Sequence, residues 1–390
     1  MPAPHVLSNA PRAAILGGGF IGPVHAEALR RIGVSVVGVL GSSPDRAAPF
    51  AKSLGGVRIY HDLAELLGDQ AVEVVHVASP NSAHVGQVTQ LLESGRHVIC
   101  EKPLAINSAD TRKLVDLATS RPTLAAAVNY NIRYYPMCLE MRHRVARGEL
   151  GRIVNVSGSY SQDWLLYASD YNWRIEPDGG TNLRAIADIG THWMDLAQWV
   201  SGQKIESVCA DLAIVHPTRR RPAGQSETFG GWGGERPTIP TAIQTEDQGS
   251  VLIRLSGGAH GAFQVSQVFA GRKNRLWLEI SGTDGSMAWD SQEPNQLWVG
   301  RRDRANERIE RDPTLLSAEA AGASHYPGGH AEGFPDTFKH LFLDVYRRII
   351  RGQLMNPTFP TFADGHRELL LCEAIAQSAH EERWASVSSR

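Results

Sequence analysis

The chain of 390 residues is poor in cysteine and has no long apolar run. The cysteines are far apart and form no CxxC pair, which argues against a zinc knuckle or a disulfide framework and favours reduced thiols. No stretch of eighteen apolar residues occurs, so no membrane-spanning helix is predicted. Residues 1–10 lack the basic and apolar segments of a secretory signal. We therefore expect a cytoplasmic protein without a membrane partner.

An excess of one charge sign is also missing, because 39 basic and 41 acidic side chains give a formal net charge of −2. No basic stripe is interleaved with aromatic residues, so the sequence predicts no nucleic-acid partner. A hydrophobic content of 42% and a charged content of 21% are ordinary for a globular protein. The length indicates two domains.

Two patterns follow one another along the chain. In the first 130 residues, short apolar runs alternate with amphipathic segments, which predicts a parallel sheet covered by helices on both faces. Later strand-like runs are separated by turns such as Gly257-Gly258, which predicts an open antiparallel sheet. The fold class is thus α/β, with a Rossmann domain at residues 1–135 and an α+β domain for substrate binding and oligomerisation at 136–390. A helix is expected over 182–200, and a mobile excursion over the Gly-, Pro- and Arg-rich segment 216–240.

A GxGxxG pattern runs from Gly17 to Gly22, directly after a predicted strand and at the start of a predicted helix. Gly17 permits a tight turn, Gly19 lets the backbone approach a pyrophosphate, and Gly22 permits close helix–strand packing. Phe20 and Ile21 complete the loop and begin a helix whose N-terminal N–H groups suit phosphates. The pattern predicts a dinucleotide site, and the alternative is a Gly-rich turn without a ligand.

The end of the second predicted strand bears on the choice between NAD and NADP. An NAD-selective site usually carries a carboxylate close to Gly41, whereas this chain has Ser42 and Ser43, with Arg46 following. Small hydroxyls and a guanidinium suit the 2′-phosphate of NADP, which the sequence therefore favours. Two alternatives remain open: Asp45 binding the ribose diol, and Arg46 merely beginning a solvated helix.

Two further polar groups are candidates for chemistry. Glu101 and Lys102 end the fifth predicted strand at the carboxyl edge of the sheet, where a nicotinamide would lie; the alternative is a solvated strand end. Asp188 and His192 are spaced i and i+4 and share a face if helical, so the carboxylate can orient an imidazole base. A metal site that adds Asp195 is the competing interpretation, though no closely spaced third ligand completes it, and a purely structural pair is another. We predict no metal.

Polar and aromatic side chains elsewhere suit a hydroxylated ring. The loop after residue 160 offers Gln162 and Trp164 as substrate contacts. Asn131 is a further candidate for the cofactor, and Arg133 and His330 are further candidates for the substrate. Each has an alternative role as a loop anchor.

Together these motifs resemble the Gfo/Idh/MocA family of oxidoreductases, over nearly the whole chain. The resemblance rests on Gly17–Gly22, Ser79-Pro80-Asn81 with His84, Glu101-Lys102-Pro103, and Asp188 with His192. It implies that Lys102, Asp188 and His192 are catalytic. It also implies that residues after the fourth and fifth strands and a later Trp-Arg pair contact the cofactor: Ser79, Asn81, His84, Glu101, Lys102, Trp173 and Arg174. One departure is that Gly179 precedes Asp188 by nine residues, whereas the family commonly has six.

The expected activity is hydride transfer between NAD or NADP and a carbinol or ketone carbon of a sugar, anhydrosugar or cyclitol. His192 would exchange the hydroxyl proton, Lys102 would hydrogen-bond the same oxygen, and Asp188 would orient His192. Two other classes stay open: a hydrolase or lyase of the same fold that uses bound nicotinamide transiently, and a non-catalytic sensor. The exposed strands of a large sheet and the family resemblance suggest a homodimer or homotetramer.

Overall fold

The computed structural model describes residues 6–175, 183–223 and 237–387, and the chain divides into two compact units. Unit 1 consists of residues 1–134 and 334–369, and unit 2 of residues 135–333 and 370–390. The sequence prediction divided the chain once, after residue 135. By their packing, residues 334–369 go with unit 1, because Phe338 and Phe342 join its core. Among the described residues, no helix has the length and apolar character needed to cross a membrane.

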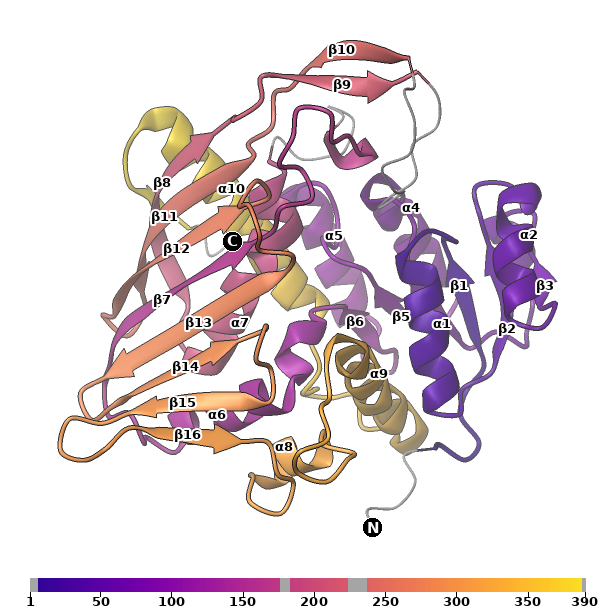
Figure 1. The fold of residues 1–390 in the computed structure, drawn as a ribbon. Helices are drawn as coiled ribbons and strands as arrows, with labels where there is room; N and C mark the ends of the chain where they lie inside the picture. The colour runs from indigo at the N-terminus through magenta and orange to yellow at the C-terminus, as the bar shows by residue number, and fades with distance from the viewer. Residues whose placement is uncertain (1–5, 176–182, 224–236, 388–390) are drawn as a thin grey trace. The chain divides into compact units, whose positions relative to one another are not determined.

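Unit 1 is built on a six-stranded parallel sheet with the order β3-β2-β1-β4-β5-β6 (Figure 1). This is the strand order of a Rossmann fold, as the sequence predicts. The strands are β1 (Ala13–Leu16), β2 (Val36–Leu40), β3 (Arg58–Ile59), β4 (Val74–Val77), β5 (His97–Cys100) and β6 (Ala126–Val128). The helices are α1 (Ile21–Arg31), α2 (Pro44–Ser53), α3 (Leu63–Gly68), α4 (Asn81–Glu93), α5 (Ser108–Thr119) and α9 (Phe334–Arg351), with a 3₁₀ turn at Asn131–Tyr134.

Helices cover both faces of this sheet, because alternate side chains of each buried strand point to opposite faces. Ile15 packs in one apolar cluster with residues of α1, α2 and α9, and Leu16 packs in another with residues of α3, α4 and α5. The carboxyl ends of the strands are level: Leu16 pairs with Leu40 and Val77, and Cys100 pairs with Val77. The residues that follow these strands therefore share one edge of the sheet.

Unit 2 contains a nine-stranded sheet with the order β16-β15-β14-β13-β7-β12-β11-β8-β17. The predicted antiparallel arrangement is confirmed for every pair but one, since β7 and β12 are parallel and the sheet is mixed. Its strands are β7 (Ile153–Ser161), β8 (Ile205–Ala213), β11 (Gln248–Leu255), β12 (His260–Ser266), β13 (Arg275–Gly282), β14 (Ser286–Asp290), β15 (Gln296–Gly300), β16 (Glu307–Glu310) and β17 (Ala385–Ser386).

The helices of unit 2 include α6 (Pro136–Ala146), α7 (Thr191–Ser201) and α8 (Ala318–Gly322), and α10 (Phe362–Glu381) contributes its C-terminal half. Helix α7 lies on the sheet through Trp193, whose indole N–H donates to the Trp277 carbonyl over 2.9 Å. Gly158 of β7 has no side chain at this contact, and a Cβ there would lie 2.3 Å from Trp193 Nε1. This close approach fixes the start of α7, where His192 lies.

Segment 216–240, predicted to be a mobile excursion, contains two paired strands, β9 (Thr218–Pro222) and β10 (Thr238–Ala242), outside the large sheet (Figure 1). Residues 224–236 lie outside the described residues. The prediction overlooked the strands because Pro and Arg dominate the segment.

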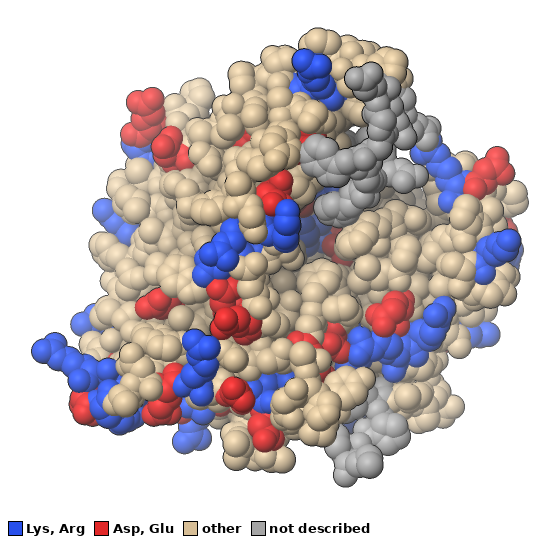
Figure 2. Space-filling model, viewed as in Figure 1, with Lys and Arg blue, Asp and Glu red and all other residues tan. Residues whose placement is uncertain are grey.

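The edge strand β16 carries charges of both signs. Arg308 lies 3.6 Å from Glu293, and Arg304 lies 3.9 Å from Glu307. Figure 2 shows basic and acidic side chains intermixed at this edge of unit 2. Such charges discourage pairing of an exposed edge with another strand.

Candidate functional site

The glycine loop leaves β1 at the carboxyl edge of the parallel sheet. Gly17 has a φ of +99°, and a Cβ there would lie 2.2 Å from the Ala78 carbonyl oxygen. A Cβ on Gly22 would lie 2.2 Å from the Gly17 carbonyl oxygen. A Cβ on Gly19, by contrast, would meet no atom within 4 Å. The fold therefore requires glycine at Gly17 and Gly22, whereas Gly19 borders open space that a ligand can approach.

The start of α1 offers N–H groups without a side-chain cap. Phe20 is the N-cap residue, its side chain makes no cap hydrogen bond, and the residue is 53% exposed. Ile21 begins the helix and is half-buried. The open Gly19 and the uncapped helix start together fit a dinucleotide pyrophosphate.

The segment after β2 has the predicted polar composition but a partly structural role. The Ser43 hydroxyl caps α2 by accepting from the Arg46 backbone N–H at 3.4 Å. The side chains of Ser42, Asp45 and Arg46 are exposed. A Cβ on Gly41 would lie 3.0 Å from Ala47 Cβ, so an acidic side chain there would require a shift.

His84 joins the segments that follow β4 and β5. Its buried ring lies between the Pro103 and Ser79 carbonyl oxygens, each 3.0 Å from a ring nitrogen. Burial lowers the pKa of His84, against the opposing effect of these hydrogen bonds, and a neutral ring donates to one carbonyl at a time. Ser79 also donates to Gln87 at 2.6 Å, and Asn81 begins α4. His84 thus positions both segments, and direct cofactor contacts of these residues stay predictions.

Glu101 is buried and held by three donors. His25 Nε2 lies 2.9 Å from Glu101 Oε1, Asn129 donates a short hydrogen bond to the same oxygen, and the Lys102 backbone N–H lies 3.3 Å from Oε2. Burial alone would raise the pKa of Glu101, but the hydrogen bonds from His25 and Asn129 and the nearby charge of Lys102 outweigh it, and the pKa lies below its usual value. Glu101 is therefore a carboxylate beside Lys102, and the half-buried Lys102 is not simply part of a solvated strand end.

A chain of buried rings continues behind Glu101. His25 Nδ1 lies 3.1 Å from His76 Nδ1, and His76 Nε2 lies 3.1 Å from the Tyr346 hydroxyl. Burial, and then the neighbouring His25, lower the pKa of His76. With both imidazoles neutral, each ring donates once, and because the carboxylate can only accept, the donors run in one direction: from Tyr346 to His76, from His76 to His25, and from His25 to Glu101.

The two residues proposed beyond β6 serve as anchors within unit 1. The Asn131 amide donates to the Thr337 hydroxyl at 2.7 Å, and Arg133 pairs with Asp364 at 2.8 Å. Both side chains are buried. These contacts correspond to the loop-anchor alternative, and their binding roles stay predictions.

In unit 2, Asp188 lies in a single π-helical turn, Ile186–Gly190, which runs directly into α7. The sequence predicted one regular helix from residue 182, but residues 176–182, including Gly179, lie outside the described residues. Asp188 Oδ2 accepts from Gln267 Nε2 at 2.9 Å, and Oδ1 lies 3.5 Å from Arg174 Nε. π-helical turns are rare in proteins as a whole, and those that occur are often found at functional sites.

His192 is the second residue of α7 and is 9% exposed. Its ring centroid lies 6.2 Å from that of Tyr160, on β7. Burial, and then the negative charge of Asp188, raise the pKa of Tyr160 well above its usual value. Trp173 begins a short 3₁₀ turn, Trp173–Ile175, and its side chain lies outside the described residues.

The predicted substrate loop is held in one conformation. Trp164 Nε1 donates to Gln162 Oε1 at 2.7 Å, and Gln162 Nε2 donates to Asn274 Oδ1 at 2.7 Å. His330 is exposed, and its Nδ1 lies 3.3 Å from the Gly328 carbonyl oxygen within its own turn. Substrate contacts of these side chains stay predictions.

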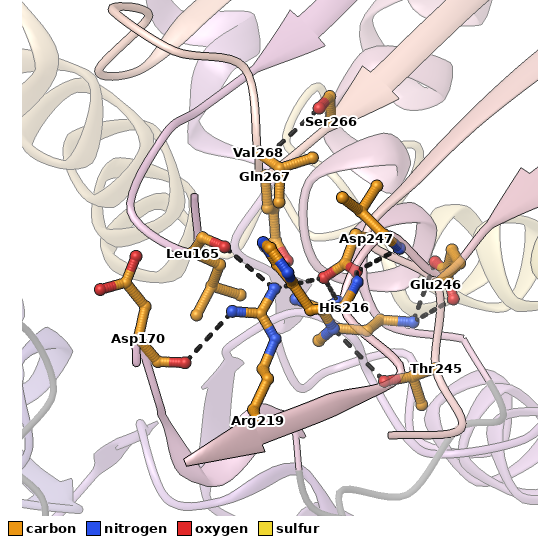
Figure 3. A network of polar contacts seen from close by, with 12 residues as sticks. Leu165, Asp170, His216, Arg219, Thr245, Glu246, Asp247, Ser266, Gln267 and Val268 are labelled. Atoms are coloured by element: carbon orange, nitrogen blue, oxygen red, sulfur yellow. Dashed lines mark hydrogen bonds and ion pairs between the residues drawn. The ribbon is translucent and has the colours of Figure 1, made fainter. Parts of the chain in front are cut away.

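The buried polar network shown in Figure 3, which contacts Asp188 through Gln267, was not predicted from the sequence. Its four charged members come from three separate segments and are all buried: Arg184, Arg219, and the adjacent Glu246 and Asp247. The one available signal is the pair Glu246-Asp247 directly before a predicted strand, where charged residues are rarely buried without partners.

Comparison with known proteins agrees with this geometry. Residues 11–130 match the oxidoreductase family with the NAD-binding Rossmann fold, and residues 138–288 match the GFO/IDH/MocA C-terminal domain. The chain is 29% identical to levoglucosan dehydrogenase of Pseudarthrobacter phenanthrenivorans, over 96% of this chain and 97% of the relative. It is 28% identical to myo-inositol 2-dehydrogenase of Thermotoga maritima, over 95% and 97%.

A solved structure of levoglucosan dehydrogenase with NADH and L-sorbose superposes with a TM-score of 0.86 at 26% identity, covering 97% of this chain and 99% of that one. The matched regions include the glycine loop, Glu101-Lys102, Asp188 and His192. The chain therefore belongs to the Gfo/Idh/MocA family of NAD-binding oxidoreductases.

Proposed function

We propose that the protein is a dehydrogenase or reductase for a CH–OH group of a sugar, anhydrosugar or cyclitol. The observation that carries this proposal is the setting of Asp188: its carboxylate is held by Gln267 and Arg174 in a π turn that leads into His192. A carboxylate on the same helical segment as an imidazole can orient that imidazole as a general base. The named relatives act on levoglucosan and myo-inositol, which fall in this substrate class.

In this proposal the chain supplies binding, orientation and proton transfer. The glycine loop and the start of α1 bind the cofactor pyrophosphate, and the bound nicotinamide supplies the hydride acceptor or donor. His192 takes the hydroxyl proton during oxidation and returns it during reduction, and Asp188 orients the imidazole. Lys102 donates a hydrogen bond to the same substrate oxygen and stabilises its developing charge, while Glu101 fixes the backbone that carries Lys102.

The test is absorbance at 340 nm with NAD and NADP against levoglucosan, myo-inositol and common aldoses. We expect net cofactor reduction with at least one of them. We also expect kcat to fall about 100- to 10,000-fold in His192→Ala and Lys102→Ala, as for other acid–base groups. The exposed Lys113→Ala is the control and should keep wild-type activity. Turnover without net cofactor change would instead favour the hydrolase or lyase, and cofactor binding without turnover would favour the sensor.

We further propose that the end of β2 prefers NADP, because Ser42 and Arg46 are exposed there and no carboxylate follows the strand directly. Arg46→Ala should weaken NADP binding about tenfold or more and leave NAD binding nearly unchanged, since hydrogen bonds to charged groups contribute about 1.5–3 kcal/mol. Calorimetric titration measures both affinities, with the exposed Arg30→Ala as control. A loss of NAD affinity in Asp45→Ala would favour diol binding by that carboxylate.

Assembly as a homodimer or homotetramer is part of the same proposal. Helices α6 and α7 pack on one face of the large sheet, while Trp277 and Trp298 are only half-buried. A second copy on the other face would cover such side chains. Light scattering after size-exclusion chromatography gives the mass, and a monomer at micromolar concentration would contradict the proposal.

A further inference from the structure

Gln267 links Asp188 to the buried network. It directly follows β12, and its side chain is fully buried. Gln267 Nε2 donates to Asp188 Oδ2 at 2.9 Å, and Gln267 Oε1 accepts from Arg184 Nη1 at 3.1 Å. In the opposite amide orientation, the Gln267 oxygen would face the Asp188 carboxylate, and the Gln267 NH2 group would face the Arg184 guanidinium, so neither contact would be a hydrogen bond. The neighbours of Gln267 therefore fix its N–H group toward the Asp188 carboxylate.

The guanidinium on the far side of the amide is itself fixed. Arg184 makes a short ion pair with Asp247. Asp247 also accepts from Arg219 Nη2 at 2.6 Å (Figure 3). Burial acts to raise the pKa of Asp247, but Arg184, backbone hydrogen bonds and Arg219 outweigh it, and the pKa lies below its usual value. A cation on the carbonyl end of an amide strengthens the N–H donor at the other end. Gln267 is thus a polarised donor aimed at Asp188.

The same residue is bonded to the predicted substrate loop. The Leu165 backbone N–H donates to the Gln267 carbonyl at 3.2 Å, and the Gln267 N–H donates to the Asp247 carbonyl at 3.0 Å. Arg219 closes the connection, since its guanidinium donates to the carbonyl oxygens of Leu165 at 2.9 Å and Tyr167 at 2.8 Å. The loop that carries Trp164 and the Asp188 carboxylate therefore share one rigid support.

We propose that Gln267 is a positioning residue for the reaction: it holds the Asp188 carboxylate in one orientation and attaches it to the substrate loop. The inference rests on the proposed function, in which Asp188 orients His192. Gln267 acts through Asp188 and has no chemical role of its own.

The variant Gln267→Glu tests the N–H group selectively. It keeps an oxygen for Arg184 but replaces the donor 2.9 Å from Asp188 with a second acceptor. Two carboxylates at this distance share a proton, which raises the apparent pKa of the pair. We expect kcat to fall about 10- to 100-fold with a smaller change in KM, and the acid limb of the kcat–pH profile to move up by about 1–2 pH units.

The matched control is Gln90→Glu, the same change at an exposed position on α4, which should keep the wild-type profile. Gln267→Met keeps the side-chain volume, removes the amide and adds no charge. Gln267→Met should lower kcat at least fivefold, with a smaller shift of the acid limb than Gln267→Glu. If Gln267→Glu does not fold, the kcat of Gln267→Met tests the proposal by itself. A variant at Gln267 with wild-type kcat and an unshifted acid limb would overturn the proposal.

A second readout needs no activity. Urea unfolding of Gln267→Glu, Asp188→Asn and the double variant forms a cycle that measures coupling between the two positions. We expect Gln267→Glu to reduce the folding equilibrium constant at least tenfold more with Asp188 present than with Asp188→Asn. If this coupling is found but the wild-type protein oxidises no substrate, the proposed function is wrong, whereas the conclusion that Gln267 holds Asp188 is retained. If the two changes are additive, Gln267 does not hold Asp188 and the inference is wrong.

Discussion

Glu246 gives the protein a stability that depends on pH in an unusual direction. Its buried carboxyl group accepts from the backbone N–H groups of Arg184 at 2.9 Å and Ile186 at 2.8 Å, at the start of the turn that carries Asp188. Burial raises the pKa of Glu246 from 4.5 to about 7, although those two hydrogen bonds act to lower it. The folded protein therefore binds a proton here at pH values where the unfolded chain has released it.

The sign follows from this difference in proton binding. Between pH 4.5 and about 7 the folded state holds more protons than the unfolded state, so the free energy of unfolding falls as the pH rises. The contribution is fully present below pH 4.5 and lost above about pH 7. A pKa raised from 4.5 to about 7 corresponds to roughly 3 kcal/mol, most of which is lost between pH 5 and 8.

The substitution Glu246→Gln removes the titration but keeps an oxygen for the backbone donors. Urea unfolding followed by tryptophan fluorescence reports on unit 2 alone, because all nine tryptophans of the chain belong to it. The stability difference between wild type and variant should change by roughly 2 to 3 kcal/mol between pH 5 and 8. The exposed Glu206→Gln is the control for the loss of one carboxylate. Parallel pH curves for wild type and Glu246→Gln would refute the reasoning.

Four further substitutions test other parts of the molecule. Gly19→Ala should leave thermal stability unchanged but weaken cofactor binding at least tenfold. Gly17→Ala should lower both the stability and the cofactor affinity, because its Cβ would lie 2.2 Å from a carbonyl oxygen. Thermal melts measure the stability of the two variants, and calorimetry measures their cofactor affinity. Tyr346→Phe leaves the buried His76 without its donor and should destabilise unit 1 by about 1–3 kcal/mol, measured by hydrogen exchange. Asp247→Asn leaves two buried guanidinium groups poorly neutralised and should destabilise unit 2 by about 3–5 kcal/mol, measured by tryptophan fluorescence. A variant as stable as the wild-type protein would contradict the prediction for Gly17→Ala, Tyr346→Phe or Asp247→Asn.

The features readable from the sequence are those in which neighbours along the chain decide the structure. The glycine loop is one, since Gly17 and Gly22 are required by contacts within one strand–turn–helix unit and with the adjacent strand. The period of apolar residues likewise predicted the parallel sheet and most strands of the mixed sheet. The π turn at Asp188 was missed because a single wide turn follows from packing and leaves the spacing of apolar residues nearly intact.

The polar network was missed for a different reason. The side chains that bond to one another in it lie 28 to 83 residues apart, and no local pattern indicates which charges pair. Arg219 in particular is fully buried, although it lies in a segment whose composition suggested solvent exposure. Arginine is rarely buried without partners, and those partners are backbone carbonyls and Asp247 from other segments.

The return of residues 334–369 to unit 1 has a consequence for biosynthesis. Phe338, Phe342 and Tyr346 of α9 complete an apolar cluster that also contains Ile15 and Ile99 of the parallel sheet. A ribosome makes these residues after the whole of segment 135–333, so the nascent Rossmann unit lacks one of the helices that cover this face until nearly nine-tenths of the chain exists. At about 5–20 residues per second this delay is roughly 10–40 seconds, during which an apolar face of the sheet is open to chaperones or to aggregation.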